Sequence, residues 1–549
     1  MSFNEKPGPP PSTADTLKET IEDRKSDFGS RPDTTATTPV NGSVNELTTV
    51  RTETVHDKLE EDPTAGEHLK EPEHPVMDLA NGIVAWDGQD DPLNPKNFPL
   101  KLKWTILALV SSITLVSPLA SSMFAPGVGF MNKEFGNTST ILSSFVVSVF
   151  VLGYAVGPLF LSPLSEIYGR GPVLNYANAF FVVWQIGCAL APNLNSLIVF
   201  RFFSGVGGSG CLTIGGGVIS DLFPAEQRGK ATAIYAMGPL FGPVIGPICG
   251  GFIAQRVGWR WVYWVLLICS GLVTALIWVL NRESNPRVLL ARKTTALKKE
   301  TGNEGLVSWY DREHVGPPLS PIAVLTHGLM RPLKLLIMSP IVALLSLYMS
   351  ITYGLLYLLF TTITSVFQGQ YGWEPDMTGL AYLGIGIGLF LGVGAVAKIS
   401  DATVIKLAKR NGGVPEPEMR LPSCMIFGMF LPISLFWYGW VTEKHVHWIV
   451  AIISMIPFGF GMMGIFIPVQ TYLIDAFPEY AASVIASLTA TRSLFGAFLP
   501  MAGPSMYGKL GLGWGNTLLG FLGLILVPFL PFIYKYGKTI RSKWPVDLR

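Results

Sequence analysis

The chain has 549 residues and a formal net charge of +2; charged residues make up 14% of it and the hydrophobic residues AVILMFWYC make up 49%. A soluble protein of this length needs more charge to cover its surface, so the composition excludes an ordinary soluble enzyme and predicts an integral membrane protein. The near-neutral balance gives no sign of a nucleic-acid partner, and we expect none.

The N-terminal region, residues 1–95, is rich in Ser, Thr, Pro, Asp and Glu and poor in aromatic residues. Such a segment buries too little apolar surface to offset the entropy lost on ordering, which predicts a disordered tail. No apolar signal-peptide core follows Met1. We therefore expect the first membrane span to act as the signal and the tail to stay in the cytosol.

Twelve apolar runs of about 20 residues follow, each long enough to cross about 30 Å of hydrocarbon. The expected spans are 104–125, 139–162, 172–191, 196–220, 230–254, 259–281, 339–362, 376–397, 421–441, 447–470, 480–503 and 513–534. The sequence thus predicts an all-α membrane protein of twelve transmembrane helices in two six-helix bundles. Its parts are an N-terminal bundle at 96–281, a linker at 282–335, a C-terminal bundle at 336–535 and a tail at 536–549.

Lysine and arginine gather on one side of these spans. The linker alone carries nine of them between Arg282 and Lys334. The positive-inside rule places the linker and both termini in the cytosol. We expect the plasma membrane, with the vacuolar membrane as the alternative.

The two bundles carry similar short sequences at matching positions. ISDLFPAE closes span 4 and LIDAFPEY closes span 10, so that both place Asp-x-Phe-Pro at a cytosolic helix end. A glycine also precedes an acidic residue by nine positions after span 2, at Gly157 and Glu166, and after span 8, at Gly392 and Asp401. Equivalent positions in two halves indicate a parallel internal repeat.

Span 5 contains the stretch GPLFGPVIGPICGG, in which glycine recurs every four residues. Its residues are Gly238, Pro239, Gly242, Pro243, Gly246, Pro247, Gly250 and Gly251. A period of four puts a stripe without side chains on one helix face, where another helix can approach closely. Each proline removes an internal hydrogen bond, so neighbouring helices must support the bend. A kinked packing helix without a specific function is the alternative.

Charged side chains inside the spans are costly, which makes each a candidate functional residue. The two are Arg201 in span 4 and Arg492 in span 11, and a structural role is the alternative for both. No Asp or Glu falls in the middle of a span. Candidates for the proton-titrating group are therefore Asp221 and Asp475 at the cytosolic ends of spans 4 and 10, with helix capping or gate closing as the alternative.

Three more charged residues stand at cytosolic mouths of the spans: Glu166, Arg170 and Asp401. We expect them to latch the cytosolic gate by binding an opposite charge or a helix end.

Spans 7 and 10 carry aromatic and mildly polar side chains at helical spacing. The residues are Tyr353, Tyr357 and Phe360 in span 7, and Phe458, Met462, Met463 and Gln470 in span 10. Such a surface suits flat apolar or cationic molecules, and with Arg492 it is the candidate substrate path. Ordinary helix packing is the alternative.

Several kinds of chemistry have no signal in the sequence. The five cysteines lie inside apolar segments, so we expect neither a disulfide framework nor a metal site. No GxxxxGK[ST] loop, nucleophile elbow or His/Cys cluster is present, so we expect no enzyme, no cofactor and no ATP-driven transport.

The chain after residue 90 resembles the major facilitator superfamily. GPLFLSPLSEIYGRGP (157–172) is similar to its loop 2–3 signature, with Glu166 near the usual Asp, and RFFSGVGGSG (201–210) to its span 4 signature, with Ser204 where many members have Gln. GPLFGPVIGPICGG resembles the span 5 signature of twelve-span drug/proton antiporters. DPLNPKNFPLKLKW, RESNPRVLLARKTTALKKETGN and PEMRLP are similar to segments of the fungal multidrug and polyamine exporters.

The resemblance implies proton-coupled efflux, by alternating access, of hydrophobic or cationic molecules such as drugs, toxins or polyamines. It implies that the Gly–Pro stripe seals the pathway against proton leak and that Arg201 positions or modulates proton transfer. Proton-coupled uptake would predict a carboxylate within span 1, which is absent, and a transporter-like nutrient sensor would need a folded cytosolic extension. Expected partners are a small-molecule substrate, protons and the lipid bilayer, and we expect a monomer.

Overall fold

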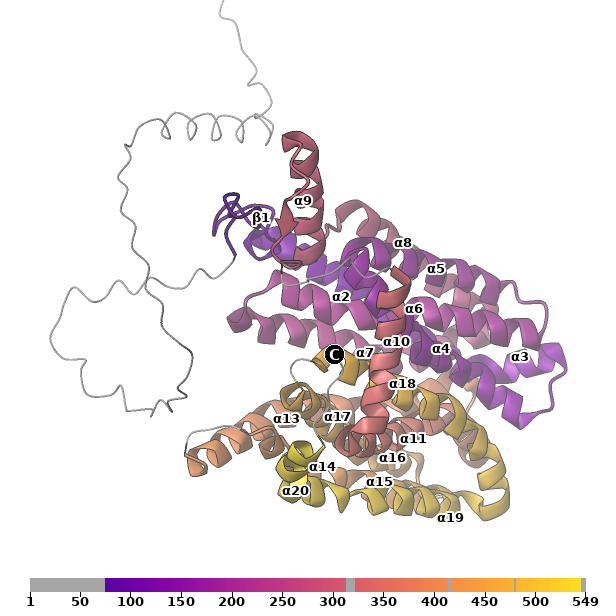
Figure 1. Cartoon of the computed structure of the whole chain (residues 1–549). Coiled ribbons are helices and arrows are strands. Elements are labelled where there is room, and N and C mark those ends of the chain that lie inside the picture. The colour runs from indigo at the N-terminus through magenta and orange to yellow at the C-terminus, as the bar shows by residue number, and fades with distance from the viewer. Residues whose placement is uncertain (1–74, 313–320, 413–415, 478–479, 545–549) are drawn as a thin grey trace, which may run out of the picture. The chain divides into compact units, whose positions relative to one another are not determined.

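The computed structural model describes residues 75–312, 321–412, 416–477 and 480–544 (Figure 1). The first 74 residues of the expected tail and the last five residues of the C-terminal tail lie outside this range.

Six long helices form the N-terminal bundle, in the indigo to magenta part of Figure 1. They are α2 (Leu100–Ser122), α4 (Thr140–Ile167), α5 (Arg170–Ala189), α6 (Leu194–Leu222), α7 (Ala225–Arg256) and α8 (Arg260–Leu280). The short η2 (Ala125–Gly127) and α3 (Val128–Phe135) connect α2 to α4. These helices coincide with the six spans expected in this half.

The C-terminal bundle, orange to yellow in Figure 1, has more interrupted helices. Spans 7 and 11 are α11 (Pro340–Tyr371) and α18 (Ala481–Phe498), the latter followed by η6 (Leu499–Met501). Span 8 consists of α12 (Pro375–Thr378), η3 (Gly379–Tyr382) and α13 (Leu383–Arg410), and span 9 of η4 (Pro417–Arg420), α14 (Leu421–Gly428) and α15 (Phe430–Glu443). Span 10 consists of α16 (Trp448–Ser454) and α17 (Ile456–Ala476), and span 12 of α19 (Ala502–Leu526) and α20 (Phe529–Lys543). Gly511 breaks α19 with a φ of +73°, so the helix of span 12 begins after it.

By length and hydropathy, ten helical stretches of the described chain could each cross a membrane. One of them, Ser483–Lys543, has 61 residues and holds both spans 11 and 12. The remaining span is α5, whose Asn175, Asn178 and Gln185 lower its hydropathy. The structure therefore accommodates twelve transmembrane helices, as the sequence predicts.

Local sequence sets where the helices begin and end. The side-chain oxygens of Ser139, Asn193 and Ser339 accept hydrogen bonds from backbone N–H groups in the first turns of α4, α6 and α11. These bonds satisfy donors that a helix start leaves unpaired. Gly372 ends α11 in the left-handed conformation, at a φ of +65°, which glycine adopts without steric cost.

Each bundle has its own apolar core, made of buried residues from its own helices. The core of the C-terminal bundle also includes three residues of the N-terminal bundle: Val151 of α4 and Leu240 and Val244 of α7. The faces of α4 and α7 that carry these residues are therefore parts of the contact between the bundles.

The segment before the first span packs on the linker, although the tail was expected to be disordered up to residue 95. Strand β1 (Ile83–Val84) pairs in parallel with β2 (Val307–Ser308) of the linker, and Trp86 is buried. Lys293 of α9 (Pro286–Thr301) donates hydrogen bonds to the carboxylates of Asp87 and Asp91. The order begins earlier because residues 83–86 supply apolar side chains that the average composition of the tail hides.

The linker also contains α10 (Pro321–Met338), which crosses from one bundle to the other (Figure 1). A Cβ at Gly328 would overlap the ring of Pro163 in α4, and the Ser487 hydroxyl of α18 donates to the carbonyl of Pro332. The linker helix thus touches both bundles directly.

The contact between the pre-span segment and the linker can be tested at Asp91, which is 4% exposed. Its carboxylate also accepts from the backbone N–H groups of Asp87 and Leu93. Asp91→Ala leaves those donors and Lys293 with fewer partners, which costs about 1–3 kcal/mol. We expect faster tryptic cleavage within residues 96–103, with unchanged cleavage for the exposed-site control Asp90→Ala.

Candidate functional site

The glycines of the span 5 stripe face α2. Helix α7 runs without a break through its three prolines. A Cβ at Gly238 would lie 2.9 Å, and one at Gly242 2.7 Å, from backbone nitrogens of α2. At Gly246 it would overlap the Ser122 hydroxyl, and at Gly250 the carbonyl of Met123. The predicted close helix contact is thus present, and it lies within the N-terminal bundle.

Another face of α7 meets the C-terminal bundle. A Cβ at Gly251 would lie 2.9 Å from the carbonyl of Pro375, at the start of α12. One turn further, Gln255 donates to the carboxylate of Glu374 at 2.8 Å and accepts from the backbone N–H of Asp376 at 2.7 Å. We call this end of the spans, opposite the linker, the loop side. Helix α7 therefore connects α2 to the C-terminal bundle on the loop side.

Arg201 of α6 is 1% exposed and tied to three other helices of its own bundle. Its guanidinium donates to the Tyr263 hydroxyl at 3.2 Å and to the carbonyls of Ser121 at 3.2 Å and Val147 at 3.1 Å. The Phe124 ring lies 5.3 Å from the guanidinium carbon. Donation to backbone carbonyls is the geometry expected from the structural alternative for this residue.

Tyrosines at the middle of span 7 form the contact between bundles next to Arg201. The hydroxyls of Tyr357 and Ser121 share a hydrogen bond of 3.1 Å, and the Tyr353 and Tyr357 rings lie 5.0 Å apart. The guanidinium carbon of Arg492 lies 5.1 Å from the Tyr353 ring. Residues predicted separately on spans 7 and 11 are thus brought together.

The other predicted path residues divide into two groups. The Phe360 ring lies edge-on to Tyr357, at 5.5 Å between centroids, and tilted against Tyr382, at 5.7 Å. Phe458 and Met462 are fully buried in the core of the C-terminal bundle. A Cβ at Gly392 of α13 would lie 2.9 Å from Met463, so Met463 faces helix α13, and Gln470 is half-buried. Helix packing therefore accounts for Phe458, Met462 and Met463.

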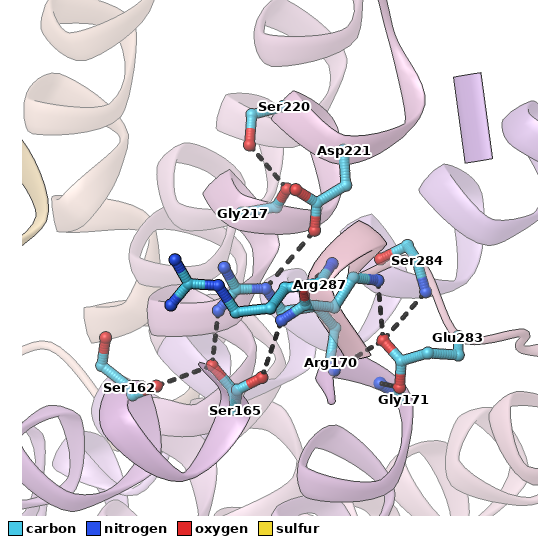
Figure 2. A network of polar contacts seen from close by, with 11 residues as sticks. Ser162, Ser165, Arg170, Gly171, Gly217, Ser220, Asp221, Glu283, Ser284 and Arg287 are labelled. Atoms are coloured by element: carbon cyan, nitrogen blue, oxygen red, sulfur yellow. Dashed lines mark hydrogen bonds and ion pairs between the residues drawn. The ribbon is translucent and has the colours of Figure 1, made fainter. Parts of the chain in front are cut away.

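On the linker side, Arg170 lies at the centre of a polar network (Figure 2). Its guanidinium contacts the Asp221 carboxylate at 3.4 Å and donates to the Ser165 hydroxyl at 2.6 Å. All three residues belong to the N-terminal bundle. These two contacts of Arg170 therefore fix α4, α5 and α6 to one another.

The carboxylate that binds a helix end is Glu283, which the sequence analysis did not single out. It accepts from the backbone N–H groups of Arg170 at 2.8 Å and Gly171 at 3.2 Å, at the start of α5, and from Ser284 and Asn285 (Figure 2). A Cβ at Gly169, where φ is +105°, would overlap Glu283. The available signal was Glu283 in RESNPRVLL, directly after span 6.

Glu166, another expected latch, makes no contact of that kind within the described residues. Its side chain is exposed, and it forms no ion pair with any residue in the described ranges. Asp401 lies in α13, but its side chain is outside what the structure describes. Of the two expected latches whose side chains the structure describes, Arg170 has an ion pair and Glu166 has none.

The C-terminal bundle repeats the pairing at the equivalent position. Arg420, at the start of span 9, contacts Asp475 at the end of span 10 at 2.6 Å. The Arg541 guanidinium of α20 donates to both oxygens of Glu418, which is 4% exposed. As with Arg170 and Asp221, each pair lies within one bundle, so both candidate titrating carboxylates have an arginine partner.

A comparison with known protein families identifies the superfamily of the chain. The model of the Major Facilitator Superfamily matches residues 110–500, more than half of the chain. The chain belongs to this superfamily. Its members are transporters, not enzymes, and among the described residues of this transporter no group of His, Cys, Asp and Glu side chains is placed to hold a metal ion.

Its relatives confirm the fungal exporter type. The MFS-type transporter penM of Penicillium rubens is 51% identical over 460 residues, which cover 84% of this chain and 89% of penM. The efflux pump radE of Floropilus chiversii is 43% identical over 461 residues, 84% of this chain and 85% of radE. The xylose transporter XylE from E. coli, in a partially occluded inward-open conformation, matches with a TM-score of 0.57 and 19% identity over 79% of this chain and 98% of XylE. At 19% identity, the likeness to XylE shows the fold alone.

The glycine stripe gives a first test of this site. Gly246→Leu inserts a side chain between α7 and α2, and overpacking costs about 1–3 kcal/mol or more. We expect the variant to reach the membrane but to lose transport, measured as substrate efflux per surface molecule. Gly271→Leu in α8 is the control, because a Cβ there meets no atom within 4 Å. Normal transport by Gly246→Leu would contradict the close-contact interpretation.

Glu283 gives a second test. Glu283→Gln removes the negative charge at the start of α5, and we expect a loss of about 1–2 kcal/mol of stability. The matched control is Glu166→Gln, an exposed carboxylate nearby, with a change within about 0.5 kcal/mol. Thermal unfolding of the purified protein in detergent compares the two. An equal effect of both variants would show that Glu283 does not cap α5.

Proposed function

We propose that this transporter exports hydrophobic small molecules, such as drugs or toxins, in exchange for protons across the plasma membrane. The supporting observation is the double contact of α7, which packs on α2 through its glycines and on α12 through Gly251 and Gln255. Helix α7 thus meets both neighbours at glycines, where the backbones come close together. We infer that this contact closes the loop side tightly. Such a seal suits an exchanger, which must not leak protons, better than a channel.

The pathway favours the hydrophobic part of the expected substrate range over cationic polyamines. A cation needs a carboxylate or an open aromatic face, and no Asp or Glu lies in the middle of any span. Arg492 lies over the Tyr353 ring, which occupies that aromatic partner with a positive charge. Apolar and aromatic substrates fit the remaining surface of Tyr353, Tyr357 and Phe360.

The expected orientation assigns a side of the membrane to each end of the spans. With the linker and both termini in the cytosol, the loop side faces outward, and the contacts of Gln255 and Gly251 close the outer gate. The ion pairs of Arg170 and Arg420 hold each bundle together at its cytosolic end, and alternating access moves the bundles about the Ser121–Tyr357 contact.

Proton coupling is tested at the buried arginine and the two paired carboxylates. Arg201→Ala should abolish proton-driven efflux, and Arg201→Lys should restore part of it, because lysine keeps the charge but loses the planar five-donor fork. If Asp221 or Asp475 titrates, its Asn variant should lose the dependence of efflux on the pH gradient while still exchanging substrate.

The measurement is efflux from proteoliposomes at several pH gradients, normalised to the amount of folded protein. Normal pH-dependent efflux in both Asn variants would exclude these carboxylates as the proton site. Normal efflux by Arg201→Ala would remove the coupling role of Arg201 and leave its hydrogen bonds as purely structural.

A further inference from the structure

Arg492 differs from the other intramembrane arginine in having no polar partner. No hydrogen bond or ion pair joins it to any residue that the structure describes, and the Nε atoms of both arginines are buried without an acceptor. Arg201, in contrast, donates to three oxygens. An arginine at the centre of a span is costly unless water, a protein acceptor or a ligand solvates it.

Two aromatic rings lie over the guanidinium of Arg492. Its central carbon lies 5.1 Å from the Tyr353 ring of α11 and 4.8 Å from the Phe466 ring of α17. A ring offers no lone-pair acceptor, so the N–H donors of the guanidinium stay available for hydrogen bonds to a ligand. Those donors match a carboxylate, which accepts two parallel hydrogen bonds.

The position of Arg492 also fits the transport path. Arg492, Tyr353 and Phe466 are each half-buried. Leu494, about 200° around the helix from Arg492, is 42% exposed and has the character of a lipid-facing residue. The Tyr353 ring contacts the ring of Tyr357, whose hydroxyl reaches the other bundle. Arg492 therefore belongs to the surface where the two bundles meet.

We propose that Arg492 is the binding residue for an acidic group on the substrate, so that the exported molecules are hydrophobic anions rather than neutral or cationic compounds. Tyr353 and Phe466 hold the guanidinium and contact the apolar part of the same molecule. This inference rests on the proposed export function and narrows its substrate class. It also explains why an uncompensated charge stands at the centre of span 11.

Binding to the purified full-length protein tests the inference without a proton gradient. Isothermal titration at pH 7 compares 2-naphthylacetic acid, which is ionised, with its methyl ester and with 2-(2-naphthyl)ethylamine. We expect the wild-type protein to bind the acid at least tenfold more tightly than the ester or the amine. Arg492→Gln should reduce acid binding to the level of the ester, and Arg492→Lys should keep part of the preference.

Thr491→Val is the matched control, because the Thr491 hydroxyl donates to carbonyls of its own helix, and it should keep the full preference for the acid. The proposal is overturned if the wild-type acid binds no more tightly than the ester, or if the preference survives Arg492→Gln in a protein of wild-type thermal stability. Proteoliposomes separate this result from the function. An acid preference that depends on Arg492, without efflux driven by a pH gradient, would refute proton exchange and leave the anion site standing.

Discussion

The packing of α7 against its neighbours without intervening side chains is the constraint on which the rest of the structure depends. Inside a membrane, apolar side chains gain nothing by leaving lipid for another helix, so association relies on close van der Waals contact and hydrogen bonds. The glycines at positions 238, 242, 246 and 250 bring α7 within backbone distance of α2. Three prolines fit into the same helix because the neighbours support it. Any larger residue at these four positions would separate α7 from α2.

Sequence reasoning predicted the fold well because length and hydropathy dominate in a membrane. The twelve spans and the close contact of Gly242 and Gly246 follow from the spacing of residues along the chain. Sequence reasoning was weaker for charged groups, because their partners come from distant segments. Glu283 caps α5 from 112 and 113 positions away, which no local pattern of the sequence indicates. Glu166, which lies within the loop 2–3 signature, is exposed instead.

The candidate path shows the same division. Periodicity placed Tyr353, Tyr357 and Phe360 on one face, and their rings do lie next to one another. The same reasoning could not orient span 10, where Phe458 faces the core. Amphipathic spacing identifies a face of a membrane helix, but lipid, core and pathway all accept aromatic side chains. Only the contacts of Arg492 with Tyr353 and Phe466 distinguish the pathway from the core.

The contacts between the bundles are weaker in kind than those within them, and this difference permits a transport cycle. Arg170–Asp221 and Arg420–Asp475 hold each bundle together internally. Between the bundles, Gln255 makes two hydrogen bonds, and Ser121–Tyr357 and Ser148–Ala497 make one each. At about 1 kcal/mol per hydrogen bond, the polar part of this contact contributes a few kcal/mol, beside the apolar contacts of α4 and α7, and a ligand's differential affinity can reverse a free-energy difference of that size. Rigid bundles joined in this way can therefore change which side of the membrane is closed without unfolding either core.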